Sequence, residues 1–184
     1  MAARIMSFET DKENGGFSTL FSQLGRFENP MESLPSIESW TPDLSGEMDM
    51  VIKANGDWVH EGGIIKRQKL SRLFSSILKK EAEDYFLLTP VEKWKISVED
   101  QPFVIALMEE VDGAIILMTN MGEEVTLGPD CLLEVDDHEA PKVLIRKNLY
   151  ARLSRTVFYQ LAEMTNKEAD GFFIESQGQR IKLG

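Results

Sequence analysis

The two histidines and the single cysteine are the side chains of this sequence best suited to catalysis or metal binding. His60 precedes Glu61 in the run Trp58-Val59-His60-Glu61-Gly62, and a histidine beside a carboxylate can serve as acid and base. Such neighbours are more often structural or surface contacts, so an enzyme that uses this pair is our third hypothesis. A zinc site would need His60, His138 and Cys131 together, and their spacing matches no zinc pattern. We therefore expect no catalytic residue and no metal site.

The acidic residues and the glycines also lack the spacing of a known site. An adjacent pair such as Asp136-Asp137 places its two side chains on opposite faces of a strand, so they do not converge. The sequence contains no EF-hand loop, no Walker A loop, no GxGxxG after a strand and no GxSxG. We therefore expect no cofactor.

Two basic pairs, Lys66-Arg67 and Arg146-Lys147, stand where the apolar pattern predicts that a helix begins. Cations there oppose the helix dipole, at a cost of roughly 0.3–1 kcal/mol each, whereas phosphate binds well at a helix N-terminus. An ordinary solvated first turn explains either pair alone. Because the arrangement occurs twice, an anion site explains it about equally well, and both interpretations stay open.

Further basic and aromatic residues extend the candidate anion site. Arg152 and Arg155 follow the second pair along the predicted helix, and arginine can bind phosphate through two hydrogen bonds. Tryptophan can offer a flat face to a base, although it packs more often in a core or at its rim. The predicted ligand-binding set consists of Trp58, His60, Lys66, Arg67, Trp94, Arg146, Arg152 and Arg155.

Hydrophobic periodicity predicts a protein of mixed helices and strands. Apolar residues recur at helical spacing from Leu70 to Leu78, which predicts a helix from about Lys66, and a longer helix is predicted over residues 148–164. Asn55-Gly56 predicts a hairpin turn. The predicted strands cover residues 48–53, 58–65, 85–89, 94–98, 103–109, 114–119, 123–127, 132–135, 143–145, 172–175 and 180–183.

Residues 1–40 are predicted to form an N-terminal extension. A polar stretch ends at Gly15-Gly16, and a segment punctuated by Pro30 and Pro35 is expected to run as an extended strap anchored by Trp40. Between them a short amphipathic helix is predicted, with an apolar face formed by Phe17, Leu20, Phe21, Leu24 and Phe27.

The two halves of the sequence share an order of elements. At an offset of 145 − 65 = 80, Ile65-Lys66-Arg67 aligns with Ile145-Arg146-Lys147. After the helices the offset grows, and Tyr85-Phe86-Leu87 matches Phe172-Phe173-Ile174. In each half a strand leads to a basic pair, a helix and an aromatic-rich strand, which predicts a duplicated β–α–β core.

The composition excludes some classes of partner. The 31 acidic and 20 basic residues give a net charge of −11, which repels the phosphate backbone of DNA or RNA. No apolar run approaches the ~20 residues that a membrane helix needs, and the N-terminus has no apolar stretch typical of a signal peptide. The single cysteine suits a reducing compartment. We expect a cytoplasmic protein without nucleic-acid or membrane partners.

Several longer runs stand in a fixed order between residue 37 and the C-terminus. They are Trp40-Thr41-Pro42, Asn55-Gly56-Asp57-Trp58-Val59-His60-Glu61-Gly62, Leu73-Phe74-Ser75, Tyr85-Phe86-Leu87-Leu88-Thr89-Pro90-Val91-Glu92-Lys93 and Ile96-Ser97-Val98-Glu99-Asp100-Gln101-Pro102-Phe103. In this order they resemble the bacterial family called domain of unknown function 1285. Gly63-Ile64 departs from the resemblance, because a proline is expected near the helix entry.

The resemblance implies a fold and a place for a ligand. It implies a duplicated α+β core whose C-terminal half is similar to a pleckstrin-homology barrel. With the order of elements, it indicates a first α+β half over residues 41–98 and a second over 99–184. It also implies a nucleotide-like ligand at the interface of the halves and a role in bacterial signal transduction, with no catalytic activity established for the family.

The leading hypothesis is a protein that binds a phosphate-bearing, nucleotide-like small molecule between its two halves through the predicted ligand-binding set. The alternative is a protein–protein interaction module without a small-molecule ligand, which would use a sheet edge or the N-terminal strap. The sequence does not predict an oligomeric state.

Overall fold

The computed structural model describes Leu20 and residues 37–129, 131, 133–135, 140–169 and 171–183. Leu20 is helical and fully buried, as the predicted amphipathic helix requires, and Trp40 is buried as the predicted anchor. The rest of that helix, most of the strap before Ile37, and His138 lie outside the described residues.

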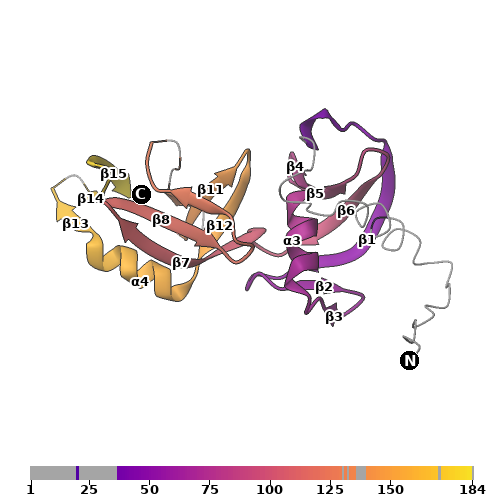
Figure 1. The fold of residues 1–184 in the computed structure, drawn as a ribbon, viewed down its shortest axis with the longest axis horizontal. Helices are drawn as coiled ribbons and strands as arrows, with labels where there is room; N and C mark the ends of the chain where they lie inside the picture. The colour runs from indigo at the N-terminus through magenta and orange to yellow at the C-terminus, as the bar shows by residue number, and fades with distance from the viewer. Residues whose placement is uncertain are drawn as a thin grey trace, which may run out of the picture.

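The first half is a six-stranded sheet with one helix (Figure 1). A short 3-10 turn, η1 (Ile37–Ser39), precedes it, and α3 (Gln68–Ser76) lies on the side that faces the second half. The sheet order is β3-β2-β1-β6-β5-β4, in which only β1 and β6 are parallel neighbours. The strands are β1 (Leu44–Ile52), β2 (Trp58–His60), β3 (Gly63–Ile64), β4 (Leu78–Glu81), β5 (Asp84–Leu88) and β6 (Lys93–Val98).

The second half contains a six-stranded sheet, a three-stranded sheet and the helix α4 (Arg155–Met164). The larger sheet has the order β10-β11-β12-β7-β8-β9, with β7 and β12 parallel. Its strands are β7 (Phe103–Val111), β8 (Ala114–Thr119), β9 (Glu124–Thr126), β10 (Leu133–Val135), β11 (Pro141–Arg146) and β12 (Leu149–Leu153). The smaller sheet consists of β13 (Asn166–Glu168), β14 (Gly171–Ser176) and β15 (Gln179–Leu183).

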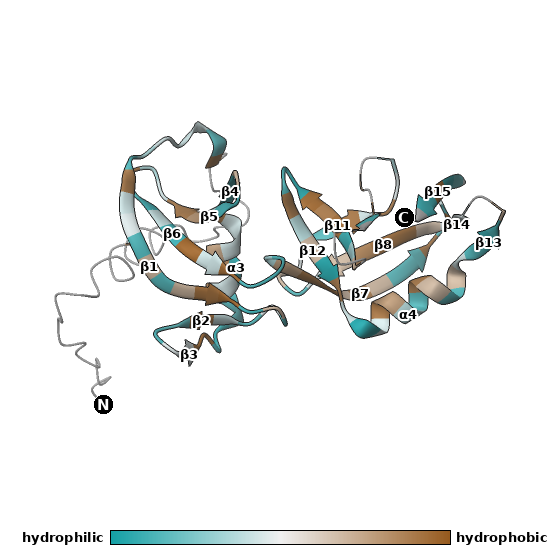
Figure 2. Ribbon diagram, turned by 180° about the vertical axis from the view of Figure 1, so that it is seen from behind, coloured by the Kyte–Doolittle hydropathy of each residue, from teal (hydrophilic) through white to brown (hydrophobic). Residues whose placement is uncertain are grey.

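Apolar side chains from both halves form one contiguous core. In β8, Ile115 and Leu117 are buried while their neighbours are partly exposed, which is the alternation expected of a strand with one covered face. In β5, the whole run Tyr85-Phe86-Leu87-Leu88 is buried because both faces are covered. Figure 2 shows hydrophobic colours on strands such as β8 and on stretches of α4.

A unit of one helix and three strands is repeated in the two halves. The helices begin at Gln68 and Arg155, an offset of 155 − 68 = 87. The same offset aligns the cross-strand partners, since Phe86 faces Lys95 in one hairpin and Phe173 faces Lys182 in the other. The predicted duplication of an α+β core is therefore confirmed. The offset of 80 proposed for the helices is wrong, because it aligns most of α3 with β12.

The repeat extends to individual side-chain contacts. In each copy a cation forms an ion pair with a glutamate and lies over an aromatic ring, 4.3 Å from the ring centroid in the first copy and 3.7 Å in the second. The triplets are Lys93, Glu81 and Phe86 in the first half and Arg180, Glu168 and Phe173 in the second, all separated by 87 positions. The repeated unit therefore preserves side-chain packing as well as topology.

The helix predicted over residues 148–164 begins only at Arg155. Leu149 and Leu153 fit the four-residue spacing of a helix, but with Ala151 they also fit every second position of a strand, and they are the buried side of β12. The prediction that Arg146-Lys147 opens a helix is therefore wrong. Arg146 ends β11, and Lys147 lies in the β11–β12 turn with a φ of 53°.

Candidate functional site

A pocket of about 240 Å³ lies where the two halves meet, beside the N-terminal part of α3. The first half contributes the β1–β2 turn, the start of β2, the segment before α3 and two helix residues. The second half contributes the turn between β8 and β9. The lining residues are Asn55, Gly56, Asp57, Trp58, Ile65, Lys66, Gln68, Ser71, Asn120 and Met121.

Asn120 joins the two halves at the edge of this pocket. Its amide Nδ2 donates to the carbonyl oxygen of Gly56 at 3.3 Å, and its Oδ1 accepts from the backbone N–H of Val104 at 3.1 Å. Gly56 has a φ of 88°, and a Cβ added there would lie 2.4 Å from Asn120 Nδ2. The sequence predicted the Asn55-Gly56 turn. It gave no sign that the Asn120 side chain of the other half packs against this glycine.

The start of α3 lacks a side-chain cap. Its N-cap residue, Arg67, makes no capping hydrogen bond, and the first turn contains no acidic residue. The equivalent position before α4 is Ser154, whose hydroxyl accepts from the N–H of Val157 at 3.4 Å. The N–H of Leu70, the equivalent of Val157, donates to the carbonyl oxygen of Arg67 at 2.9 Å, so the N–H groups of Gln68 and Lys69 are the ones left without an acceptor among the described residues. They lie next to the part of the pocket lined by Lys66 and Gln68.

Lys66 adds a hydrogen-bond donor to the same pocket, and Trp58 forms part of its wall. Trp58 is only 1% exposed and stacks on Phe74, with ring centroids 6.0 Å apart. Its indole Nε1 is buried and has no hydrogen-bond partner among the described residues. Lys66 is exposed, and within the described part of the chain it has no ion-pair partner. The lining thus offers the exposed ammonium of Lys66 to an anionic ligand, beside the Asp57 carboxylate, which already accepts from Asn55 Nδ2 at 2.8 Å.

Profiles of two domains match the chain from residue 35 to residue 183. The DUF1285 N-terminal domain, a domain of unknown function, matches residues 35–101, and the DUF1285 C-terminal domain, from proteins of unknown function, matches residues 102–183. The chain belongs to the DUF1285 family.

Two crystal structures of DUF1285 family proteins are similar to this chain. The protein from Silicibacter pomeroyi DSS-3 is 31% identical, with a TM-score of 0.78 over 89% of this chain and 93% of that one. The protein from Shewanella baltica OS155 is 27% identical, with a TM-score of 0.54 over 63% of this chain and 91% of that one. No curated protein matches this chain.

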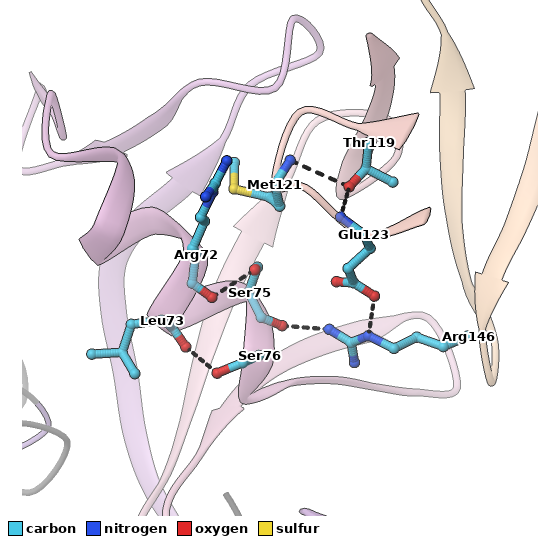
Figure 3. Close-up of polar contacts among 8 residues, drawn as sticks. All are labelled: Arg72, Leu73, Ser75, Ser76, Thr119, Met121, Glu123 and Arg146. Carbon is cyan, nitrogen blue, oxygen red and sulfur yellow. Dashed lines mark hydrogen bonds and ion pairs between the residues drawn. The ribbon is translucent and has the colours of Figure 1, made fainter. Parts of the chain in front are cut away.

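In this DUF1285 chain the two basic pairs lie at opposite ends of α3. Lys66 borders its first turn, whereas Arg146 reaches its last turn and donates to the carbonyl oxygen of Ser75 at 2.5 Å (Figure 3). The Nε of Arg146 donates to Glu123 at 2.9 Å, so its charge is neutralised within the protein. Lys147 pairs with Glu38 at 2.8 Å. The pairs therefore do not face one shared cleft.

The remaining members of the predicted set lie outside the lining of the pocket. Arg152, on β12, binds the Asp100 carboxylate through two hydrogen bonds of 2.8 and 2.5 Å. Arg155 is exposed at the first position of α4. The other members are Arg67 at the N-cap of α3, Trp94 on β6 and His60, whose Nδ1 lies 4.0 Å from the Glu61 carboxylate. Of the eight predicted residues, the pocket brings together Trp58 and Lys66.

Among the described residues, the potential metal ligands and the single cysteine of this DUF1285 protein lie apart from the pocket lining, except for Asp57. Its described residues contain no group of three or more His, Cys, Asp or Glu side chains that could hold a metal ion. Burial raises the pKa of the Cys131 thiol to about 11, so the thiol stays protonated near neutral pH and is a poor nucleophile. No helix among the described residues is both long and apolar enough to cross a membrane.

Proposed function

We propose that this DUF1285 protein binds a small phosphate-bearing ligand, such as a mononucleotide, in the pocket between its halves. The observation that carries the proposal is the uncapped start of α3 beside this pocket. In the second copy of the repeat, a serine hydroxyl caps the equivalent turn. A phosphate oxygen would accept from the N–H groups of Gln68 and Lys69 at the start of α3.

The other donors in the pocket support the same ligand class. Lys66 supplies a positive charge for phosphate, and the Trp58 side chain adds an aromatic wall to the pocket. Asn55 and Asn120 already bond within the protein through both amide atoms, and each Nδ2 keeps a second N–H that suits a hydroxyl or phosphate oxygen. Pockets for drug-sized ligands have volumes of roughly 300–1,000 Å³, so a pocket of about 240 Å³ suits a mononucleotide or a smaller phosphate ester.

The architecture suggests why the ligand would matter. Because the pocket takes residues from both halves, a bound ligand favours the arrangement in which the β8–β9 turn lies against α3. We extend the proposal, on the family resemblance, to a role in cytoplasmic signal transduction in bacteria and to a pleckstrin-homology-like barrel in the second half. Hydrogen bonds from Ile115 N–H to Ser176 Oγ (3.0 Å) and from Gln177 N–H to the carbonyl of Gly113 (2.7 Å) support the barrel, because they join β14 and its turn to β8.

The experiment is thermal unfolding and calorimetric titration with inorganic phosphate and a panel of mononucleotides. A ligand at about 100 times its Kd adds about 2.7 kcal/mol of stability, which raises the Tm of a chain of this size by roughly 5–10 °C. Lys66→Ala should weaken binding about tenfold, because a charge-assisted hydrogen bond is worth about 1.5 kcal/mol or more. The matched control, Lys69→Ala, removes an exposed lysine three positions later, in the first turn of α3 and outside the pocket lining, and should leave affinity unchanged.

A second pair of variants tests the uncapped turn itself. Arg67→Ser should introduce the cap that α4 already has, and Arg67→Ala removes the same charge without adding a hydroxyl. Urea denaturation should give the serine variant a free energy of unfolding about 0.5–2 kcal/mol higher than that of the alanine variant. The serine variant should also bind the ligand more weakly, because its hydroxyl competes for the N–H groups at the start of α3. The proposal is wrong if no phosphate compound at millimolar concentration stabilises the protein, or if Lys66→Ala and Lys69→Ala behave alike.

A further inference from the structure

The outward face of α4 carries two exposed aromatic side chains. Phe158 is 44% exposed and Tyr159 is 55% exposed, and their rings meet edge to face with centroids 5.7 Å apart. The opposite face of the helix packs into the core through Val157 and Leu161. Isolated exposed apolar residues are common on protein surfaces, whereas here two large aromatics adjoin and form a small apolar patch.

The internal repeat shows what the equivalent face does in the first half. At the offset of 87, Phe158 and Tyr159 correspond to Ser71 and Arg72 of α3. Those two residues face the second half: Ser71 lines the pocket with Met121, and the guanidinium of Arg72 lies against Gly122. Figure 3 shows Arg72 beside the Met121 side chain. This helix face is thus an interface in the first copy of the repeat, whereas in the second copy its aromatic residues are exposed.

The charges of α4 indicate which partner fits. Arg155 occupies the first position of the helix and Glu163 lies near its end, so each charge opposes the helix dipole. Both side chains are exposed, and neither forms an ion pair with another described residue. If a second α4 packs antiparallel with Tyr159 at the two-fold axis, Arg155 of one helix lies opposite Glu163 of the other. Each charge then meets an opposite charge and the favourable end of the neighbouring dipole.

We infer that α4 is a self-association surface at which two copies of this chain pack their α4 helices antiparallel. The four aromatic rings form the centre of the interface, and two Arg155–Glu163 ion pairs flank it. Such an interface is isologous, because the same surface of each copy takes part. It contains tyrosine and arginine, which are enriched among the residues that contribute most to binding energy. A ten-residue helix is only about 15 Å long, so the contact is small and belongs with the weak, concentration-dependent class of interface.

Sedimentation equilibrium of the full chain across a range of protein concentrations tests the inference. The wild type should shift from monomer to dimer with concentration. Tyr159→Ala should weaken the dimer at least about tenfold, as expected for a central aromatic residue worth about 1.4 kcal/mol or more. The control Val91→Ala truncates a side chain that is 68% exposed in the first half and should leave the dimer unchanged. Circular dichroism and thermal unfolding confirm that each variant folds.

Charge reversal tests the antiparallel geometry separately. Arg155→Glu and Glu163→Arg should each weaken the dimer, because each places like charges together, and the double variant should restore it. The inference is overturned if the wild type remains monomeric at all concentrations, if Tyr159→Ala dimerises as well as the wild type, or if the double reversal fails to recover the loss caused by the single ones. Phosphate ligands are absent from this assay, so its result is independent of the proposed ligand site.

Discussion

At the residue scale, Gly56 is required by its neighbour in the other half. A side chain at this position would adopt an unfavourable positive φ and would also collide with the Asn120 amide, which lies 2.4 Å from the place of a Cβ. Gly62 also has a positive φ, 75°, but no atom lies within 4 Å of its Cβ position. Substituting each glycine in turn therefore distinguishes the free-energy cost of backbone strain, which both substitutions carry, from the cost of the clash between the halves, which only the change at Gly56 carries.

We expect Gly56→Ala to lower the free energy of unfolding by more than Gly62→Ala does. Positive φ at a non-glycine residue costs of order 1–3 kcal/mol in either variant, and only Gly56→Ala adds the clash with Asn120. Urea denaturation measures both. In the double variant Gly56→Ala, Asn120→Ala the clash is absent, so the two changes should cost less together than their sum. Equal effects of Gly56→Ala and Gly62→Ala would show that the contact between Gly56 and Asn120 is not close.

At the element scale, the repeated unit of helix and hairpin was predictable in kind but not in register. The aromatic runs of β5 and β14 align at 87, and the structure extends that offset to the helices and both hairpin ladders. The sequence favoured 80 because two basic pairs matched there. Charge pairs carry little structural information, however, since they lie on solvated surfaces in turns and helices alike. The better signal was Ser154, a preferred N-cap residue directly before the apolar face of α4.

The ion pairs of the repeated hairpins should make stability depend on pH. Hydrogen bonds from Lys93, and secondarily from Lys79, lower the pKa of Glu81 below its ordinary value of 4.5. Because the folded pKa is the lower one, the stabilisation is fully present above pH 4.5 and is lost as pH falls through the folded pKa. Glu81 is partly exposed, so the effect is at most about 1 kcal/mol.

Urea midpoints measured from neutral to acidic pH should therefore fall less steeply for Glu81→Gln than for the wild type. The matched control is Glu83→Gln, since Glu83 lies in the turn that directly follows β4 with a side chain that is 95% exposed, and it should follow the wild-type curve. If Glu81→Gln and Glu83→Gln show the same pH profile, the Lys93–Glu81 pair makes no contribution to acid stability.

At the scale of the whole molecule, polar contacts join the halves at both ends of α3. Asn120 binds Gly56 near its start, and Arg146 binds Ser75 at its end. The family resemblance placed a ligand between the halves, but the residues that form this junction have no local pattern. Gly56 and Asn120 are separated by 64 positions, and periodicity reports only contacts within an element. Trp58 and Lys66, which do line the pocket, could be named from the sequence because they follow a hairpin turn and precede a helix start, features that have a local pattern.

Arg146 shows how the same side chain can be interpreted as a ligand group or as part of the junction. Its guanidinium joins Glu123 to the last turn of α3 and lies 5.5 Å from the centroid of the Phe103 ring. Removing it leaves the half-buried Glu123 carboxylate and the Ser75 carbonyl without this partner. We expect Arg146→Ala to cost about 1–3 kcal/mol of unfolding free energy, measured by urea denaturation without ligand.

The adjacent Lys147→Ala is the control, because Lys147 is 67% exposed and its ion pair with Glu38 is worth at most about 1 kcal/mol. The role of Arg146 then follows from comparing stability with phosphate binding. A junction residue loses stability when substituted and retains the ligand affinity of the folded fraction, since the pocket lies at the other end of α3. The opposite outcome is an Arg146→Ala protein that is as stable as Lys147→Ala but does not bind phosphate. That result would show that Arg146 contacts the ligand, and one ligand would then have to reach both ends of α3.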